Sequence, residues 1–157
     1  MQTDPEVRRY VGGQGWPLEK ALDRFQNAYL GRPVEVYGLW AAILKDENKY
    51  IGYCGLRPGE KPGVEAHIAY YVARPYWGRG LASEAVQAFI DVAFKRLNLS
   101  RVLADVEKGN AASERILQKF GFKFLSDEAI PECGRIINFY ELKKTDWKMP
   151  PENISRF

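Results

Sequence analysis

Gly78 and Gly80 stand on either side of Arg79, in a segment that can bind a phosphate-containing anion. Residues 67–73 before it alternate as in a strand, and from Ala82 the apolar residues recur at helical spacing. A glycine turn between a strand and a helix gathers free backbone N–H groups at the positive end of the helix. Glycine lets the backbone approach an anion closely, and the Arg79 guanidinium can pair with a phosphate or be simply solvated. Alone, this pattern is weak evidence, because many such turns use glycine only for tightness.

A second segment, Asn110–Phe122, strengthens the first. Asn110 is a favoured N-cap and Gly121 a favoured residue after a helix end, so a short helix leading into a strand at Phe122–Leu125 is expected. Together the two segments resemble the GCN5-related N-acetyltransferases (GNAT superfamily), and most of all the ribosomal-protein N-terminal acetyltransferase (RimJ/RimL-like) subgroup. Trp77–Ala82 occupies the Gln/Arg-x-x-Gly-x-Gly/Ala motif, with Trp77 in place of Gln or Arg. The second motif is matched by Asn110, Ser113, Lys119, Gly121 and Phe122.

The resemblance implies an α/β GNAT fold with a mixed, mostly antiparallel central sheet flanked by helices. The chain length supports a single domain, expected over residues 1–149, and Pro150 and Pro151 end regular structure, so a loose tail is expected over 150–157. The resemblance also implies acetyl-CoA as co-substrate. The residues it assigns to the cofactor are Tyr71, Val72, Trp77, Gly78, Arg79, Gly80, Leu81, Ala82, Ser83, Asn110 and Ser113.

The chemistry implied is direct attack of a primary amine on the thioester, without an enzyme nucleophile. The cofactor's pantetheine arm would pair with the strand Tyr70–Ala73, and the N–H of Val72 would donate to the oxyanion. The position often held by a catalytic Glu in the superfamily falls on His67, an imidazole that can take a proton near neutral pH. Glu65 shares the strand face of His67 and could serve instead. Ordered water, with His67 only packing on the sheet, is the other alternative.

The proton donor to the leaving thiolate has fewer candidates in the sequence. Many superfamily members have a tyrosine where this chain has Leu117, and leucine cannot donate. Ser113, one helical turn earlier, offers the only hydroxyl in the motif, although serine near a helix start often serves local hydrogen bonding. Asn110 can likewise cap the helix or bind the pantetheine arm. The aromatic residues near the site are expected to serve mostly in packing: Trp40, Tyr53, Tyr70, Tyr71, Tyr76 and Trp77.

Bulk properties agree with one soluble enzyme domain. The chain has 157 residues, 46% hydrophobic, with a net charge of +3 and no basic stripe typical of nucleic-acid binding. No apolar run reaches the ~20 residues that span a bilayer, so a cytoplasmic protein without membrane or nucleic-acid partners is expected. Cys54 and Cys133 lack metal-ligand spacing, and His67 is the one histidine, so no metal site is predicted. Cys54 is expected to be a small buried hydrophobe.

Further elements follow from the pattern. A helix begins at Pro17 and ends near Gly31, a hairpin joins Val34–Leu44 to Lys49–Leu56, and strands follow at Val64–Ala73, Arg101–Val106 and Arg135–Leu142. The family's first strand and helix would precede Asp4–Val7 and have no counterpart, which would leave a sheet edge that a homodimer could cover. Loops Arg57–Gly63 and Ser126–Arg135 are expected to select the amine: a protein N-terminus, amino acid, polyamine or drug-like amine. The alternative function is an acyl-CoA-binding module without turnover.

Overall fold

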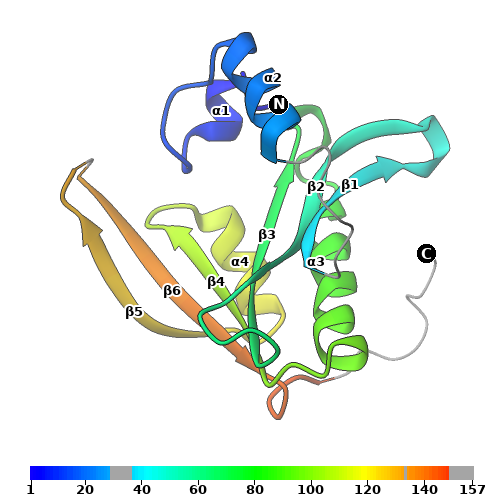
Figure 1. Cartoon of the computed structure of the whole chain (residues 1–157), viewed down its shortest axis with the longest axis vertical. Coiled ribbons are helices and arrows are strands. Elements are labelled where there is room, and N and C mark those ends of the chain that lie inside the picture. The colour runs from blue at the N-terminus through cyan, green and yellow to red at the C-terminus, as the bar shows by residue number, and fades with distance from the viewer. Residues whose placement is uncertain (29–36, 133, 149–157) are drawn as a thin grey trace.

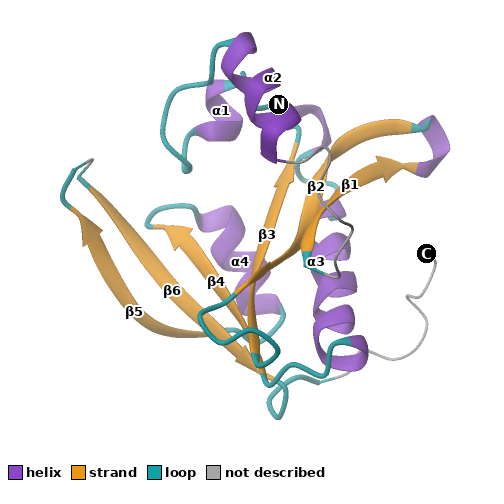
Figure 2. Ribbon diagram, in the orientation of Figure 1, coloured by secondary structure: helices purple, strands orange, loops and turns teal. Residues whose placement is uncertain are grey.

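The computed structural model describes residues 1–28, 37–132 and 134–148, arranged as a twisted sheet with helices packed on it (Figures 1 and 2). The α-helices are α1 (Pro5–Arg8), α2 (Leu18–Ala28), α3 (Leu81–Asp91) and α4 (Ala111–Lys119). The strands are β1 (Gly38–Leu44), β2 (Lys49–Pro58), β3 (Glu65–Val72), β4 (Arg101–Glu107), β5 (Lys123–Ile130) and β6 (Arg135–Lys143). Short 3₁₀ turns cover Lys45–Glu47 and Arg74–Tyr76.

The six strands have the order β1-β2-β3-β4-β6-β5. All neighbours are antiparallel except β3 and β4, which are parallel. This is the mixed, mostly antiparallel sheet that the sequence predicts. The parallel pair is short, because β3 and β4 are paired only from Glu65–Arg101 to His67–Leu103. Beyond His67 the two strands diverge, as the V between them in Figure 1 shows.

Helices α3 and α4 contribute to one core on one face of the sheet. Val86 and Ile90 of α3 and Leu117 of α4 are fully buried. They belong to the same cluster as the inward residues of the central strands, among them Leu56, Ala66, Ile68, Val102 and Leu142. Cys54 is buried in this cluster too, and burial raises the pKa of its thiol to about 12. A thiol kept protonated in this way packs as a small apolar side chain, as expected.

Most predicted elements are present, with two differences. Strand β5 continues to Ile130, whereas the sequence predicted a loop from Ser126. Almost every β5 side chain is exposed, because β5 is an edge strand. Its second half is therefore polar and lacks the apolar alternation from which a strand is predicted. The helical spacing that begins at Ala82 does not continue as one regular α-helix: α3 ends at Asp91 and a π-helical turn, Val92–Arg96, follows it. Some predicted features lie outside the described residues: the strand start at Val34, the helix end at Gly31, Cys133 and the tail over 150–157.

The N-terminal segment is held together around Arg8, which is buried. Its guanidinium donates to Gln2 Oε1 at 2.9 Å, to the carbonyl of Gln14 at 3.3 Å and to that of Val11. Gln2 in turn donates to the Tyr53 hydroxyl at 3.0 Å, which ties the segment to β2. Helix α1 is thereby fixed above the diverging ends of β3 and β4 (Figure 1).

Candidate active site

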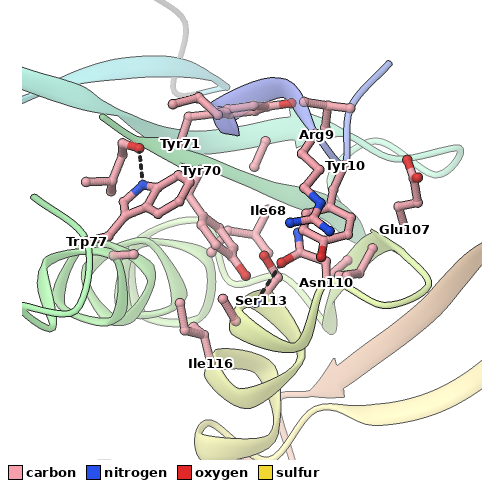
Figure 3. A pocket seen from close by; sticks show the side chains of 18 of the residues that line it. Arg9, Tyr10, Ile68, Tyr70, Tyr71, Trp77, Glu107, Asn110, Ser113 and Ile116 are labelled. Atoms are coloured by element: carbon pink, nitrogen blue, oxygen red, sulfur yellow. Dashed lines mark hydrogen bonds between the residues drawn. The ribbon is translucent and has the colours of Figure 1, made fainter. Parts of the chain in front are cut away.

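A cleft of about 1110 Å³ opens where β3 and β4 diverge. Its walls come from four parts of the chain: the last residues of β3, the last residues of β4, the glycine loop with the start of α3, and the start of α4. The N-terminal segment, including Arg9 and Tyr10, closes it from above (Figure 3). A single continuous cleft therefore joins an anion-binding loop to the unpaired end of a strand.

The glycine loop requires its glycines for their backbone conformation. Gly78 has a φ of +74° and Gly80 a φ of +80°, and no atom lies within 4 Å of a Cβ built at either position. The positive φ, and not a lack of space, is what excludes other residues. Gly80 is the N-cap residue of α3 and brings no side-chain cap, so the first N–H groups of this helix stay available to a ligand.

Trp77, the departure from the family motif, has a defined structural position. Its indole Nε1 donates to the carbonyl oxygen of Val72 at 2.6 Å, a bond drawn in Figure 3. The side chain therefore ties the glycine loop back to the last residue of β3. This hydrogen bond uses the carbonyl oxygen of Val72 and does not involve the N–H of Val72.

The last residues of β3 turn alternate backbone groups toward the cleft. The N–H of Ala73 donates to the carbonyl of Ile51 at 2.7 Å, so Ala73 is bonded to β2. Because bonded and non-bonded pairs alternate in an antiparallel ladder, the N–H groups of Tyr70 and Val72 point away from β2. They point to the side from which β4 has diverged, where an extended ligand can add as a strand.

The start of α4 forms the opposite wall. Asn110 accepts a hydrogen bond from the backbone N–H of Ser113 at 3.3 Å, so it is the N-cap that the sequence predicted. The Asn110 and Ser113 side chains both line the cleft and lie beside each other in Figure 3. Leu117 is fully buried in the core and cannot donate to anything in the cleft.

His67 belongs to a charged cluster beside the point of divergence. Its Nδ1 lies 3.1 Å from Oδ1 of Asp105 on β4, and Nη2 of Arg57 on β2 lies 3.1 Å from the same oxygen. The hydrogen bond from His67 and the nearby charge of Arg57 hold the pKa of Asp105 below its ordinary value, against the effect of burial. Asp105 and Arg57 line the cleft, whereas His67 is not among the lining residues and reaches the site through its contact with Asp105.

Glu65, the other base suggested by the sequence, is engaged elsewhere. Its side chain is 2% exposed, and one carboxylate oxygen accepts from Arg101 at 2.6 and 2.8 Å while the other accepts from the Lys61 N–H at 3.2 Å. The Arg101 hydrogen bonds lower the pKa of Glu65. It does not line the cleft. The geometry corrects this expectation: Glu65 anchors the paired end of β3 instead.

The cleft brings together most of the residues that the sequence assigned to the cofactor. The members that line it are Tyr71, Val72, Trp77, Gly78, Gly80, Leu81, Ala82, Ser83, Asn110 and Ser113. Arg79 is not among them, and its guanidinium lies 5.6 Å above the Tyr76 ring. Among the described residues, no group of three or more His, Cys, Asp or Glu side chains could hold a metal ion.

Two residues of the site were missed as candidates. Asp105 is a carboxylate within the otherwise apolar run Val102–Val106, a signal that sequence reasoning could have used. Tyr70 was assigned to packing, yet its hydroxyl oxygen is buried and has no hydrogen-bond partner among the described residues. Its position beside the cleft appears only in three dimensions.

Comparisons with known proteins agree with this geometry. The family model "Acetyltransferase (GNAT) domain" matches residues 1–123. An N-acetyltransferase of Bacillus licheniformis, p20, is 38% identical over 142 residues, covering 88% of this chain and 79% of that protein. A putative ribosomal N-acetyltransferase of Bacillus subtilis, YdaF, is 26% identical over 121 residues, covering 73% and 64% of the two chains. The chain belongs to the GNAT family.

Solved structures show the same fold. A GNAT-family acetyltransferase from Bacillus anthracis aligns with a TM-score of 0.78 at 23% identity, covering 92% of this chain and 85% of that one. The structure of yncA, a putative acetyltransferase from Salmonella typhimurium with its cofactor acetyl-CoA, aligns with a TM-score of 0.65 at 18% identity, covering 96% and 90%. Acetyl-CoA is the co-substrate of this family, and the free N–H groups of the glycine loop and of β3 suit its phosphates and its amide-bearing arm. Among the described residues, no helix is long and apolar enough to cross a membrane.

Proposed function

We propose that this protein transfers an acetyl group from acetyl-CoA to a primary amine by direct attack. The single observation that carries the proposal is the continuous cleft from the N-terminus of α3 along the unpaired end of β3 to the charged cluster at Asp105. One end suits a pyrophosphate, the middle suits an extended amide-bearing arm, and the far end suits a cation.

The far end of the cleft suits the acceptor amine. Asp105 is held anionic by His67 and Arg57, and an anionic carboxylate in a cleft wall attracts an ammonium ion. We assign deprotonation of that ammonium to His67. Because His67 does not line the cleft but contacts Asp105, the proton reaches it through water or along the Asp105 carboxylate.

The reaction centre lies at the end of β3. The amine nitrogen bonds to the thioester carbon, and the N–H of Val72 donates to the oxygen that becomes negative. The carbon–sulfur bond then breaks with its electron pair on sulfur, and the nitrogen releases its remaining extra proton to water, which leaves the neutral amide. A proton reaches the thiolate from the Ser113 hydroxyl, which solvent reprotonates. Trp77 holds the backbone at Val72 in place through its hydrogen bond to the Val72 carbonyl oxygen.

The acceptor panel should contain peptides beginning with different residues, amino acids, polyamines and aminoglycoside-type drugs. Release of free coenzyme A thiol is measured for each, beside calorimetric binding of acetyl-CoA. We expect micromolar acetyl-CoA binding and turnover with one of these amine classes. The similarity to YdaF, named as a putative ribosomal N-acetyltransferase, supports testing first the peptides that carry the N-terminal sequences of ribosomal proteins.

A binding module without turnover is the second candidate, and Leu117 favours it. The residue is fully buried and apolar, at the position where the superfamily resemblance implies a tyrosine that faces the cofactor sulfur in many members. Tight acetyl-CoA binding with no thiol release from any amine would decide for this candidate. Absence of acetyl-CoA binding would contradict both.

A further inference from the structure

Tyr70 combines three properties that packing alone does not explain. It lines the cleft, its hydroxyl oxygen is buried, and that oxygen has no hydrogen-bond partner among the described residues. A buried polar group without a partner destabilises the folded protein, so such groups usually bind a water or a ligand. The phenol therefore has an unused donor at the edge of the site.

The position of Tyr70 directs that donor to the middle of the cleft. Tyr70 precedes Val72 by two residues on β3, so both N–H groups face the diverged side while the Tyr70 side chain lies on the face covered by α4. Burial raises the pKa of Tyr70 to about 12, and the polar side chain of Ser113 on α4 acts against that shift. In Figure 3 the Tyr70 ring extends toward Ser113 at the start of α4.

We propose that the Tyr70 hydroxyl donates a hydrogen bond to the sulfur of the leaving thiolate, together with Ser113. The inference rests on the proposed acetyl transfer and assigns to β3 a donor that Leu117 cannot supply from α4. Tyr70 keeps its proton throughout, and only Ser113 passes one on. A phenol that stays neutral across the physiological range is always available as a donor.

The first test needs no acceptor amine. Coenzyme A is bound to the wild-type protein and to Tyr70→Phe, and the pKa of its thiol is measured from the ultraviolet absorbance of the thiolate. Donation to the thiolate lowers the thiol pKa in the wild type, so Tyr70→Phe should raise it by about one unit, the equivalent of a tenfold loss. Tyr37→Phe is the matched control, because its hydroxyl accepts from the Gly63 N–H outside the cleft.

The second test uses turnover with the best acceptor of the panel. Tyr70→Phe should lower kcat about tenfold and leave the acetyl-CoA Kd unchanged, as expected for a bond made only as charge develops on sulfur. Its melting temperature should stay equal or rise, because the variant removes a buried hydroxyl that has no partner among the described residues. A clear fall in melting temperature would show a structural hydroxyl and overturn the inference.

The outcomes separate this inference from the proposed function. If coenzyme A and acetyl-CoA do not bind the wild type, acetyl transfer itself is wrong. If coenzyme A binds and the thiol pKa is the same in Tyr70→Phe and the wild type, acetyl transfer stands and the role of Tyr70 is wrong. A fall in kcat without a change in the thiol pKa would equally overturn it, because Tyr70 would then act away from sulfur.

Discussion

His67 and Asp105 are joined across the last paired residues of β3 and β4, with Nδ1 of the imidazole 3.1 Å from Oδ1 of the carboxylate. His67 is opposite Leu103 in the parallel ladder, and Asp105 lies two residues further along β4, at the start of the divergence. The pair therefore marks the boundary between the closed part of the sheet and the cleft. Arg57 lies opposite His67 on β2 and donates to the same Asp105 oxygen.

If His67 accepts the amine proton, the rate of acetyl transfer should rise with pH, and His67→Gln should remove that rise. Glutamine keeps a hydrogen-bonding shape but cannot take a proton, so kcat at neutral pH should fall about tenfold or more while the acetyl-CoA Kd stays unchanged. The measurement is a pH–rate profile with two acceptors whose amines differ in pKa. If the rise in rate shifts with the pKa of the acceptor amine in both the wild type and the variant, deprotonation is assigned to ordered water.

Asp105→Asn should raise the KM for the amine. Asp105 lines the cleft where the ammonium would bind, and its pKa is held below the ordinary value, so the wild type presents a negative charge that asparagine removes. The measurement is KM for the best acceptor of the panel, with the acetyl-CoA Kd as the control. An unchanged KM would leave Asp105 with no part in acceptor binding.

Gly80→Glu should abolish acetyl-CoA binding measured by calorimetry. The substitution places bulk and negative charge at the N-terminus of α3. Gly63→Glu is a matched control, because Gly63 also has a positive φ, +79°, with no atom within 4 Å of a built Cβ, and lies outside the cleft. Both variants should lose a similar amount of stability, about 1–2 kcal/mol, from backbone strain, and only Gly80→Glu should lose binding. Equal affinity in the two would contradict the assignment of the glycine loop.

Ser113→Ala should lower kcat by ~100-fold while acetyl-CoA affinity stays nearly intact. Helix α4 should survive the change, because Asn110 accepts from the backbone N–H of residue 113, which alanine retains. Circular dichroism and the melting temperature check the helix, and thiol release checks the rate. Full activity in the variant would limit Ser113 to hydrogen bonding at the helix start, and water would then be the proton donor to the thiolate.

Glu65→Gln should cost stability and spare catalysis. Loss of the charged hydrogen bonds to Arg101 should lower the free energy of unfolding by about 2 kcal/mol at neutral pH. The pKa of Glu65 is lowered in the folded protein, so its contribution is present above the ordinary carboxyl pKa and disappears as pH falls through the lowered value. Urea unfolding between about pH 7 and pH 3 should therefore show the difference between variant and wild type shrinking with acid. A large fall in kcat in a stably folded variant would reinstate Glu65 as a base.

The sequence determined those parts of the site that depend on local chemistry. Gly78 and Gly80 encode positive φ angles, Asn110 encodes the start of α4, and the periodicity after Ala82 encodes an amphipathic helix. These features need only a few neighbouring residues, so motif and spacing were sufficient to predict them. The predicted homodimer is not tested and stays a prediction.

Only the tertiary structure decided what the polar groups do. Glu65 and His67 share a strand face and look equivalent in the sequence, but Arg101 binds one and Asp105 the other, because β4 pairs with β3 at Glu65 and diverges after His67. Tyr70 reads as a packing residue until α4 and the divergence leave its hydroxyl beside an open cleft. The partners of these side chains come from β4 and α4, more than 30 residues away in the chain, and strand pairing rather than local sequence brings them together.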